Sequence, residues 1–122
     1  MEKYEPLKQI KNIKTGIPEK TMKTYTKVYL DNLGFDETDF VQCQCCENRA
    51  TEIHHIISRK RDKKLLNDIH NLMAICRDCH QKYGEIKEFM PLLLKIQRSF
   101  LRNNGVYFSE EWFTQKLAIY EK

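Results

Sequence analysis

The chain has 122 residues, enough for one domain with a modest hydrophobic core but not for two independent ones. Its formal net charge of +4 and its sequence pI of about 8.8 permit binding to a polyanion, although solubility alone explains such a charge equally well. The chain has no apolar run of about twenty residues, and residues 1–20 lack the apolar stretch of a secretory signal, so we expect a cytoplasmic protein with no membrane partner.

The N-terminal part of the chain predicts an arm followed by a helix. Residues 1–17 are basic and weakly patterned, and we expect them to have little structure of their own. Pro18 suits the first position of a helix and Gly34 suits the residue after its end, so a helix is predicted from Pro18 through Leu33. Its apolar stripe at helical spacing indicates a face that covers the core.

Residues 40–57 predict a β-hairpin. Its turn is expected at residues 47–49 and its second strand over residues 50–57. The second strand contains His54 and His55, which point to opposite faces of a regular strand. Both histidines can therefore serve one site only if the strand ends or bends there.

The remainder of the chain predicts a polar loop, a short apolar segment and three helical stretches. The loop covers residues 58–67, and the apolar segment covers residues 71–75. A helix is expected from about Arg77 towards residue 89, and a second over residues 92–102 after an interrupting proline. Ser109 is expected to cap a last helix.

Four of the five cysteines form two Cys-x-x-Cys pairs, Cys43 with Cys46 and Cys76 with Cys79. This spacing lets both sulfurs of a pair reach one ion, and zinc accepts four thiolates tetrahedrally. We therefore expect one closed, structural Zn²⁺ site in a cytosolic chain, where disulfides are rare. Cys45 would form an adjacent pair of poorer geometry and is expected to lie outside the site. The alternative is that these cysteines hold no metal.

The residues between and after the two pairs suit the hydrolysis of a phosphodiester. The insert between the pairs covers residues 47–75, which is longer than the ~15–20 residues of a zinc ribbon. It contains three of the four histidines, and His80 follows the second pair. A divalent ion can neutralise charge on a phosphate, and a neutral imidazole can take a proton from water at cellular pH.

Residues 43–82 resemble the HNH endonucleases, whose core is a ββα-metal fold. The matching residues are Glu52-Ile53-His54-His55-Ile56-Ile57, Asn71-Leu72-Met73-Ala74-Ile75 and Cys76-Arg77-Asp78-Cys79-His80. The resemblance implies an α+β protein with a small ββα-metal core, stapled by a structural zinc and flanked by N- and C-terminal helices. We expect a single domain, 1–122, with the arm and first helix in residues 1–39, the core in 40–84 and the C-terminal helices in 85–122.

The resemblance also implies a role for each motif residue. His55 matches the general base that activates water, and Asn71 matches the residue that orients the loop bearing it. His54 and His80 match the ligands of a catalytic divalent metal. His54 replaces the commoner Asp, a variant seen in colicin nuclease domains, so that Mg²⁺, Mn²⁺, Ni²⁺ and Zn²⁺ all remain candidates. Colicin domains add a further His one turn after the last one, and Gly84 stands there in this chain.

The implied activity is hydrolysis of DNA, by nicking or by double-strand cleavage, leaving 5′-phosphate and 3′-hydroxyl ends. We expect the DNA backbone to contact basic side chains near the motif, whose alternative role is that of ordinary exposed charges: Arg59, Lys60, Arg61, Lys63, Lys64, Arg77 and Lys82. Glu52 either orients a histidine or faces solvent. His70 is expected to be structural or to support a neighbouring ligand.

Other functions are weighed against this one. A four-cysteine zinc module that binds nucleic acid without cutting needs the cysteines but not the histidines and Asn71. A zinc deaminase is excluded, because the chain has neither His-x-Glu nor a proline before either cysteine pair. RNA as substrate, the recognition sequence and the choice between monomer and homodimer stay open. A phage or mobile-element origin is an association only.

Overall fold

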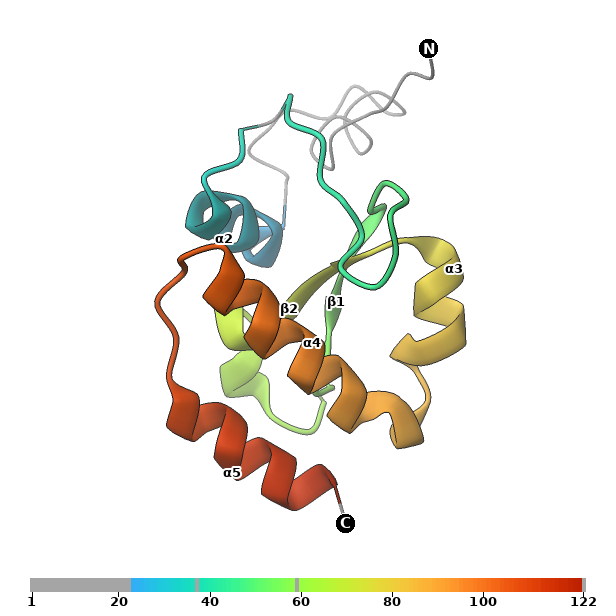
Figure 1. Cartoon of the computed structure of the whole chain (residues 1–122), viewed down its shortest axis with the longest axis vertical. Coiled ribbons are helices and arrows are strands. Elements are labelled where there is room, and N and C mark those ends of the chain that lie inside the picture. The colour runs from blue at the N-terminus through green and yellow to red at the C-terminus, as the bar shows by residue number, and fades with distance from the viewer. Residues whose placement is uncertain (1–22, 37, 59, 122) are drawn as a thin grey trace.

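The computed structural model describes residues 23–36, 38–58 and 60–121 (Figure 1). The predicted N-terminal arm, the predicted helix start at Pro18 and the side chain of Arg59 lie outside these residues. Within the described residues the first predicted helix is α2, Thr24–Leu33, which begins later than expected because Lys23 has an extended backbone. It ends at Gly34 as predicted, because Gly34 adopts a left-handed conformation (φ 74°) and its N–H bonds back to the last turn.

The sheet consists of two antiparallel strands, β1 (Glu52–His55) and β2 (Leu72–Ile75). The prediction of a hairpin within residues 40–57 is therefore wrong about which strand pairs with β1. Between its two halves, strand pairing is limited to a single bridge from Gln42 to Arg49, because the intervening chain curls around the first cysteine pair. β1 pairs instead with the apolar segment that precedes the second cysteine pair.

β2 is buried on both faces, which explains its unbroken apolar sequence. Leu72 and Ala74 belong to a hydrophobic cluster with Tyr29 of α2. Met73 and Ile75 belong to a second cluster, which they share with the two C-terminal helices. The two-stranded sheet thus lies between α2 on one face and the C-terminal helices on the other.

A short helix, α3 (Arg77–Cys79), follows the sheet and continues into a π-helical turn, His80–Gly84. The helix predicted from Arg77 towards residue 89 is therefore interrupted after Gly84, and a 3-10 turn, Lys87–Phe89, leads onward. After the π-helical turn, the Glu85 carboxylate lies beside His80.

The two C-terminal helices are α4 (Met90–Asn103) and α5 (Glu110–Tyr120). Pro91 lies in the first turn of α4, where its missing N–H is tolerated. Ser109 caps α5 as predicted, since its hydroxyl accepts the Trp112 N–H at 3.1 Å. In Figure 1, α4 crosses in front of the two strands, and α5 packs against α4.

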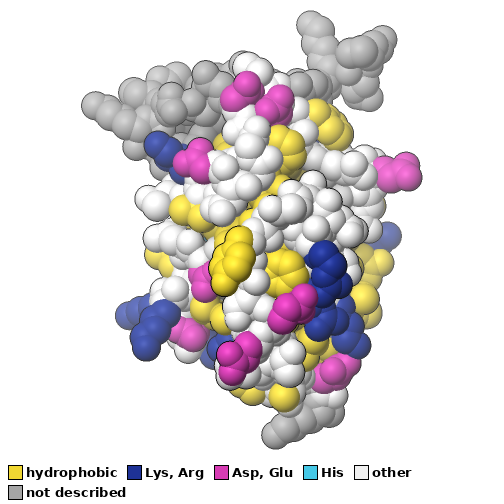
Figure 2. Space-filling model, turned by 60° about the vertical axis from the view of Figure 1, so that its left-hand side comes forward, with side chains coloured by type: hydrophobic (Ala, Val, Ile, Leu, Met, Phe, Trp, Pro, Cys, Tyr) yellow, Lys and Arg dark blue, Asp and Glu magenta, His cyan; other side chains and the backbone are white. Residues whose placement is uncertain are grey.

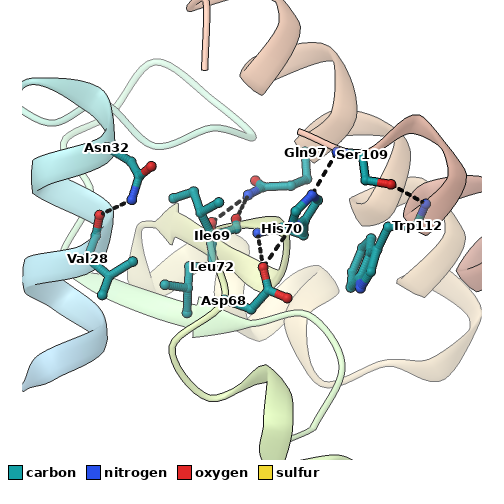
Figure 3. Close-up of polar contacts among 9 residues, drawn as sticks. All are labelled: Val28, Asn32, Asp68, Ile69, His70, Leu72, Gln97, Ser109 and Trp112. Carbon is teal, nitrogen blue, oxygen red and sulfur yellow. Dashed lines mark hydrogen bonds and ion pairs between the residues drawn. The ribbon is translucent and has the colours of Figure 1, made fainter. Parts of the chain in front are cut away.

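Gln97 of α4 ties the helix to the sheet. Its buried amide donates to the carbonyls of Ile69 (2.8 Å) and Leu72 (2.6 Å), as Figure 3 shows. Its oxygen accepts from Gln44 at 2.7 Å. These bonds fix the chain immediately before β2, where Asn71 lies.

The described surface mixes charges of both signs. On the face in Figure 2, acidic and basic side chains alternate around exposed hydrophobic ones. Within the residues the structure describes, no helix is both long enough and apolar enough to cross a membrane.

Candidate metal centre and active site

The four predicted cysteines come together in one cluster. The sulfurs of Cys43, Cys46, Cys76 and Cys79 all lie within 4.8 Å of one another, and Cys46 and Cys76 approach to 3.7 Å. Backbone N–H groups point at three of these sulfurs, an arrangement that favours thiolates. Cys45 stays outside the cluster, with its sulfur 3.9 Å from that of Met73.

The donor set fits zinc. A hydrogen bond with the Cys45 side chain lowers the pKa of Cys43, whereas burial raises the pKa of Cys46 and that of Cys79. Holding all four sulfurs as neighbouring thiolates therefore requires a cation. Four sulfurs at this spacing match a tetrahedral ion with no open position.

A second donor group is formed by His54, His80 and Glu85, whose ligand atoms also lie within 4.8 Å of one another. The two imidazole centroids are 4.8 Å apart. His54 is 9% exposed, and its buried Nε2 has no hydrogen-bond partner among the described residues. Burial, with a smaller effect of His80, lowers the pKa of His54 to about 4. A neutral, unpartnered buried nitrogen fits a metal ion, which would accept its lone pair.

His80 lies between two carboxylates. Its Nδ1 is 3.3 Å from Glu52 Oε2, and its Nε2 is 3.0 Å from Glu85 Oε2. Of the two roles left open for Glu52, the structure therefore supports the orientation of a histidine. Two imidazoles and a carboxylate form a set that divalent cations accept.

His54 and His55 occupy opposite faces of β1 but reach the same pocket. His54 pairs with Met73 across the sheet, whereas His55 pairs with Leu72 and meets Tyr25 of α2 edge-on at 4.6 Å. β1 ends at His55, as the sequence analysis required if both histidines are to serve one site. The pocket is lined by both histidines together with other side chains, among them His80, Glu85, Tyr25 and Arg61.

The tautomer of His55 is fixed by its contact with Leu66. His55 Nε2 is 2.9 Å from the Leu66 carbonyl oxygen, which can only accept, so Nε2 carries the proton. In the neutral ring Nδ1 is then the unprotonated nitrogen. The arrangement gives the pocket an imidazole that can take up a proton at Nδ1.

Asn71 is fully buried and comes directly before β2 in the chain. Its Oδ1 accepts the Ile57 N–H at 2.8 Å, and its Nδ2 donates to the Ile57 carbonyl at 3.0 Å. The Asn71 carbonyl also accepts the Ile56 N–H at 3.1 Å. These bonds hold the two residues that follow His55.

His70 faces α5 and is absent from the lining of the pocket described above. Its Nδ1 is 2.6 Å from Asp68 Oδ1, while the Ser109 N–H donates to Nε2 at 2.9 Å (Figure 3). Its ring lies 5.0 Å from that of Trp112. His70 therefore carries a proton on Nδ1 and links the entry of β2 to the cap of α5.

The predicted phosphate-binding side chains are all exposed where they are described, and only one of them lines the histidine pocket. Arg61 lines the histidine pocket, and its guanidinium lies 5.9 Å from the Tyr120 ring centroid. The others lie on the polar loop or on the turn after β2 and are absent from that lining: Lys60, Lys63, Lys64, Arg77 and Lys82. Lys87, which the sequence did not single out, lines the pocket.

Sequence reasoning also missed Glu85. The signal for Glu52 is present in the chain, because it lies two residues before His54 on the same strand face. Glu85 has no such signal in the sequence, because its approach to His80 depends on the π-helical turn.

A protein-family model described as HNH endonuclease matches residues 43–85. No curated protein and no solved structure matches the chain. The matched stretch contains the four-cysteine cluster, the two-stranded sheet with its following helix, and the His54–His80–Glu85 group. Residues 43–85 therefore form an HNH endonuclease domain.

Proposed function

We propose that the protein is a metal-dependent nuclease that hydrolyses phosphodiester bonds of DNA. The observation that carries the proposal is that His54, His80 and Glu85 share one pocket with His55 within an HNH endonuclease domain. The family supports a nucleic-acid substrate, and the site supplies both metal donors and a proton acceptor.

In this proposal the two donor groups have separate tasks. Zn²⁺ in the four-cysteine cluster is structural, because four sulfurs leave no position for substrate. His54 and His80 hold a catalytic divalent ion such as Mg²⁺, Mn²⁺, Ni²⁺ or Zn²⁺. That ion, when bound, neutralises charge on the scissile phosphate and on the departing oxygen.

His55 is the proposed general base. The Leu66 carbonyl holds its proton on Nε2, so Nδ1 takes the proton of the attacking water. The edge-on contact with Tyr25 restricts the ring, and the bonds from Asn71 fix the backbone that follows it. Neither residue needs to touch substrate for this positioning.

Arg61 and Lys87 are the proposed phosphate contacts closest to the chemistry, because both line the pocket. The lysines of the polar loop contact the DNA backbone further away. Such contacts release counterions, so binding weakens steeply as salt rises.

The decisive experiment is cleavage of supercoiled plasmid with Mg²⁺, Mn²⁺, Ni²⁺, Zn²⁺ or EDTA, comparing wild type with His55→Ala at matched zinc content. We expect metal-dependent nicking that falls by at least ~100-fold in the variant, as the loss of a general base predicts. DNA binding without cleavage under every metal would favour the non-catalytic zinc-binding module. Cleavage retained in His55→Ala would reject the assignment of the base.

A further inference from the structure

We propose that Glu85 is a third protein ligand of the metal held by His54 and His80, and that the π-helical turn His80–Gly84 brings it there. The inference rests on the proposed function and deepens it, since it defines the complete donor set of this centre. The chain would then hold the ion by two imidazoles and one carboxylate.

The turn changes which residue lies above His80. In an α-helix, side chains four residues apart lie on one face, so residue 84 would face His80. A π-helical turn accommodates one more residue, and the residue that follows it takes this place. The observed contact agrees, because the Glu85 carboxylate lies 3.0 Å from His80 Nε2.

Gly84 makes this approach possible. A Cβ at this position would lie 2.3 Å from His80 Cδ2 and 3.3 Å from His54 Nε2. The backbone of Gly84 therefore lies against both imidazoles, and a side chain there would displace a ring. Gly84 has no side chain that could donate to a metal, and the adjacent Glu85 supplies the carboxylate instead.

The two carboxylates at His80 have different roles. Glu52 faces Nδ1, the nitrogen opposite the donor group, so it holds that proton and leaves the Nε2 lone pair for a metal. Glu85 faces Nε2, on the side where the unpartnered His54 Nε2 belongs to the same group. Glu52 is thus a positioning residue and Glu85 a ligand.

The donor set predicts a preference among metals. Mg²⁺ favours oxygen ligands in a near-ideal octahedron, whereas imidazole nitrogens suit transition metals such as Ni²⁺ and Zn²⁺. Mn²⁺ belongs to the same first-row series and also accepts the carboxylate. Three protein ligands leave further positions for water and phosphate oxygen. We therefore expect the zinc-loaded protein to bind Mn²⁺ more tightly than Mg²⁺.

The test is a titration of the full, zinc-loaded chain with Mn²⁺, in which the EPR signal of the free ion reports the bound fraction. Mn²⁺ is suitable because it competes poorly with Zn²⁺ for thiolates. Glu85→Gln keeps the shape of an exposed side chain and removes one negative charge. Glu88→Gln removes the same charge from an exposed residue outside the pocket lining.

We expect wild type and Glu88→Gln to bind one Mn²⁺ with equal affinity. Glu52→Gln should weaken binding by about 10- to 100-fold, the usual effect of losing an outer partner, and Glu85→Gln by about 100-fold or more. Zinc content and circular dichroism should be identical in all variants.

Glu85→Gln binding within about twofold of Glu88→Gln would overturn the inference. His54→Ala separates this failure from failure of the proposed centre. If His54→Ala loses Mn²⁺ while Glu85→Gln retains it, the centre stands without its third ligand. If both variants retain Mn²⁺, the ion lies elsewhere and the proposed catalytic centre is also wrong.

Discussion

The side chain of Asn71 engages both backbone polar groups of Ile57, accepting its N–H at 2.8 Å and donating to its carbonyl at 3.0 Å. Asn71 comes directly before β2, and Ile57 lies two residues after the proposed base. One buried amide therefore joins the two strands at the end that carries His55, so its loss should affect both stability and catalysis.

Asn71→Ala leaves the buried Ile57 groups without partners. Each unsatisfied group costs roughly 1–3 kcal/mol, so we expect the free energy of unfolding to fall by several kcal/mol in urea denaturation. Asn32→Ala is the matched control, because Asn32 donates to the Val28 carbonyl on the exposed side of α2 (Figure 3). Equal destabilisation by the two variants would contradict this account.

Gly84→Ala should damage the site more than the fold. The new methyl group would meet the His80 ring, while the backbone of Gly84 is not in the left-handed region. We expect Mn²⁺ binding and plasmid nicking to fall at least ~10-fold with a small change in unfolding free energy.

Gly105→Ala provides the converse comparison. Gly105 has φ +69° and no heavy atom within 4 Å of the position that a Cβ would occupy, so alanine strains the backbone without a clash. We expect a loss of roughly 1–2 kcal/mol of stability and unchanged nicking per folded molecule. A Gly84→Ala protein that behaves in the same way would argue against the close approach to the histidines.

Cys79→Ser and Cys45→Ser should separate the ligand cysteines from the spare one. Removing one of four donors should release zinc and lower the melting temperature, whereas Cys45→Ser should keep one zinc per chain. Zinc content by atomic emission and thermal unfolding by circular dichroism measure both effects. Zinc loss in Cys45→Ser alone would mean that the cluster uses a different set of cysteines.

Arg61→Gln and Lys63→Gln remove equal charge from two places in the polar loop. Arg61 lines the pocket and Lys63 does not, so Arg61→Gln should reduce cleavage at saturating DNA while Lys63→Gln should change affinity only. Each lost phosphate contact should reduce the salt slope of binding by about one. Single-turnover cleavage and salt-dependent binding curves give the two quantities, and identical behaviour in both assays would contradict the distinction.

Asp68→Asn tests the link between β2 and α5. Burial raises the pKa of Asp68, but its hydrogen bonds with His70 together outweigh that effect and lower it below the usual value. The ionised carboxylate therefore stabilises the fold at pH above about 4, and this contribution is lost as pH falls through the lowered pKa. Wild type should exceed Asp68→Asn in stability at pH 7, and the difference should shrink steadily as the solution is acidified. A difference that is as large in strong acid as at pH 7 would reject this linkage.

The parts of the fold that follow local rules could be predicted from sequence. Gly34 ends α2 and Ser109 caps α5 because their conformations depend on neighbouring residues alone. The cysteine spacing likewise predicted the cluster. The partner of β1 could not be predicted, because β2 is buried on both faces and lacks the alternation that marks a strand.

The candidate site, like the fold, could be predicted from the sequence only in part. The HNH motif indicated His54, His55, Asn71 and His80, and the structure brings the three motif histidines to one pocket. Glu85 could not be predicted, because helical spacing points to position 84. The structure shows the additional residue as the π-helical turn His80–Gly84, after which the Glu85 carboxylate lies beside His80.

Cys79 and His80 are adjacent in the chain, yet they belong to different donor groups. An ion bound by the cysteines would anchor the start of the helical segment from which His80 projects. Assembly of the protein would then be sequential, with zinc acquired first and the second ion bound well only afterwards. On the proposed function, the zinc-free protein would then be inactive even when the second metal is plentiful.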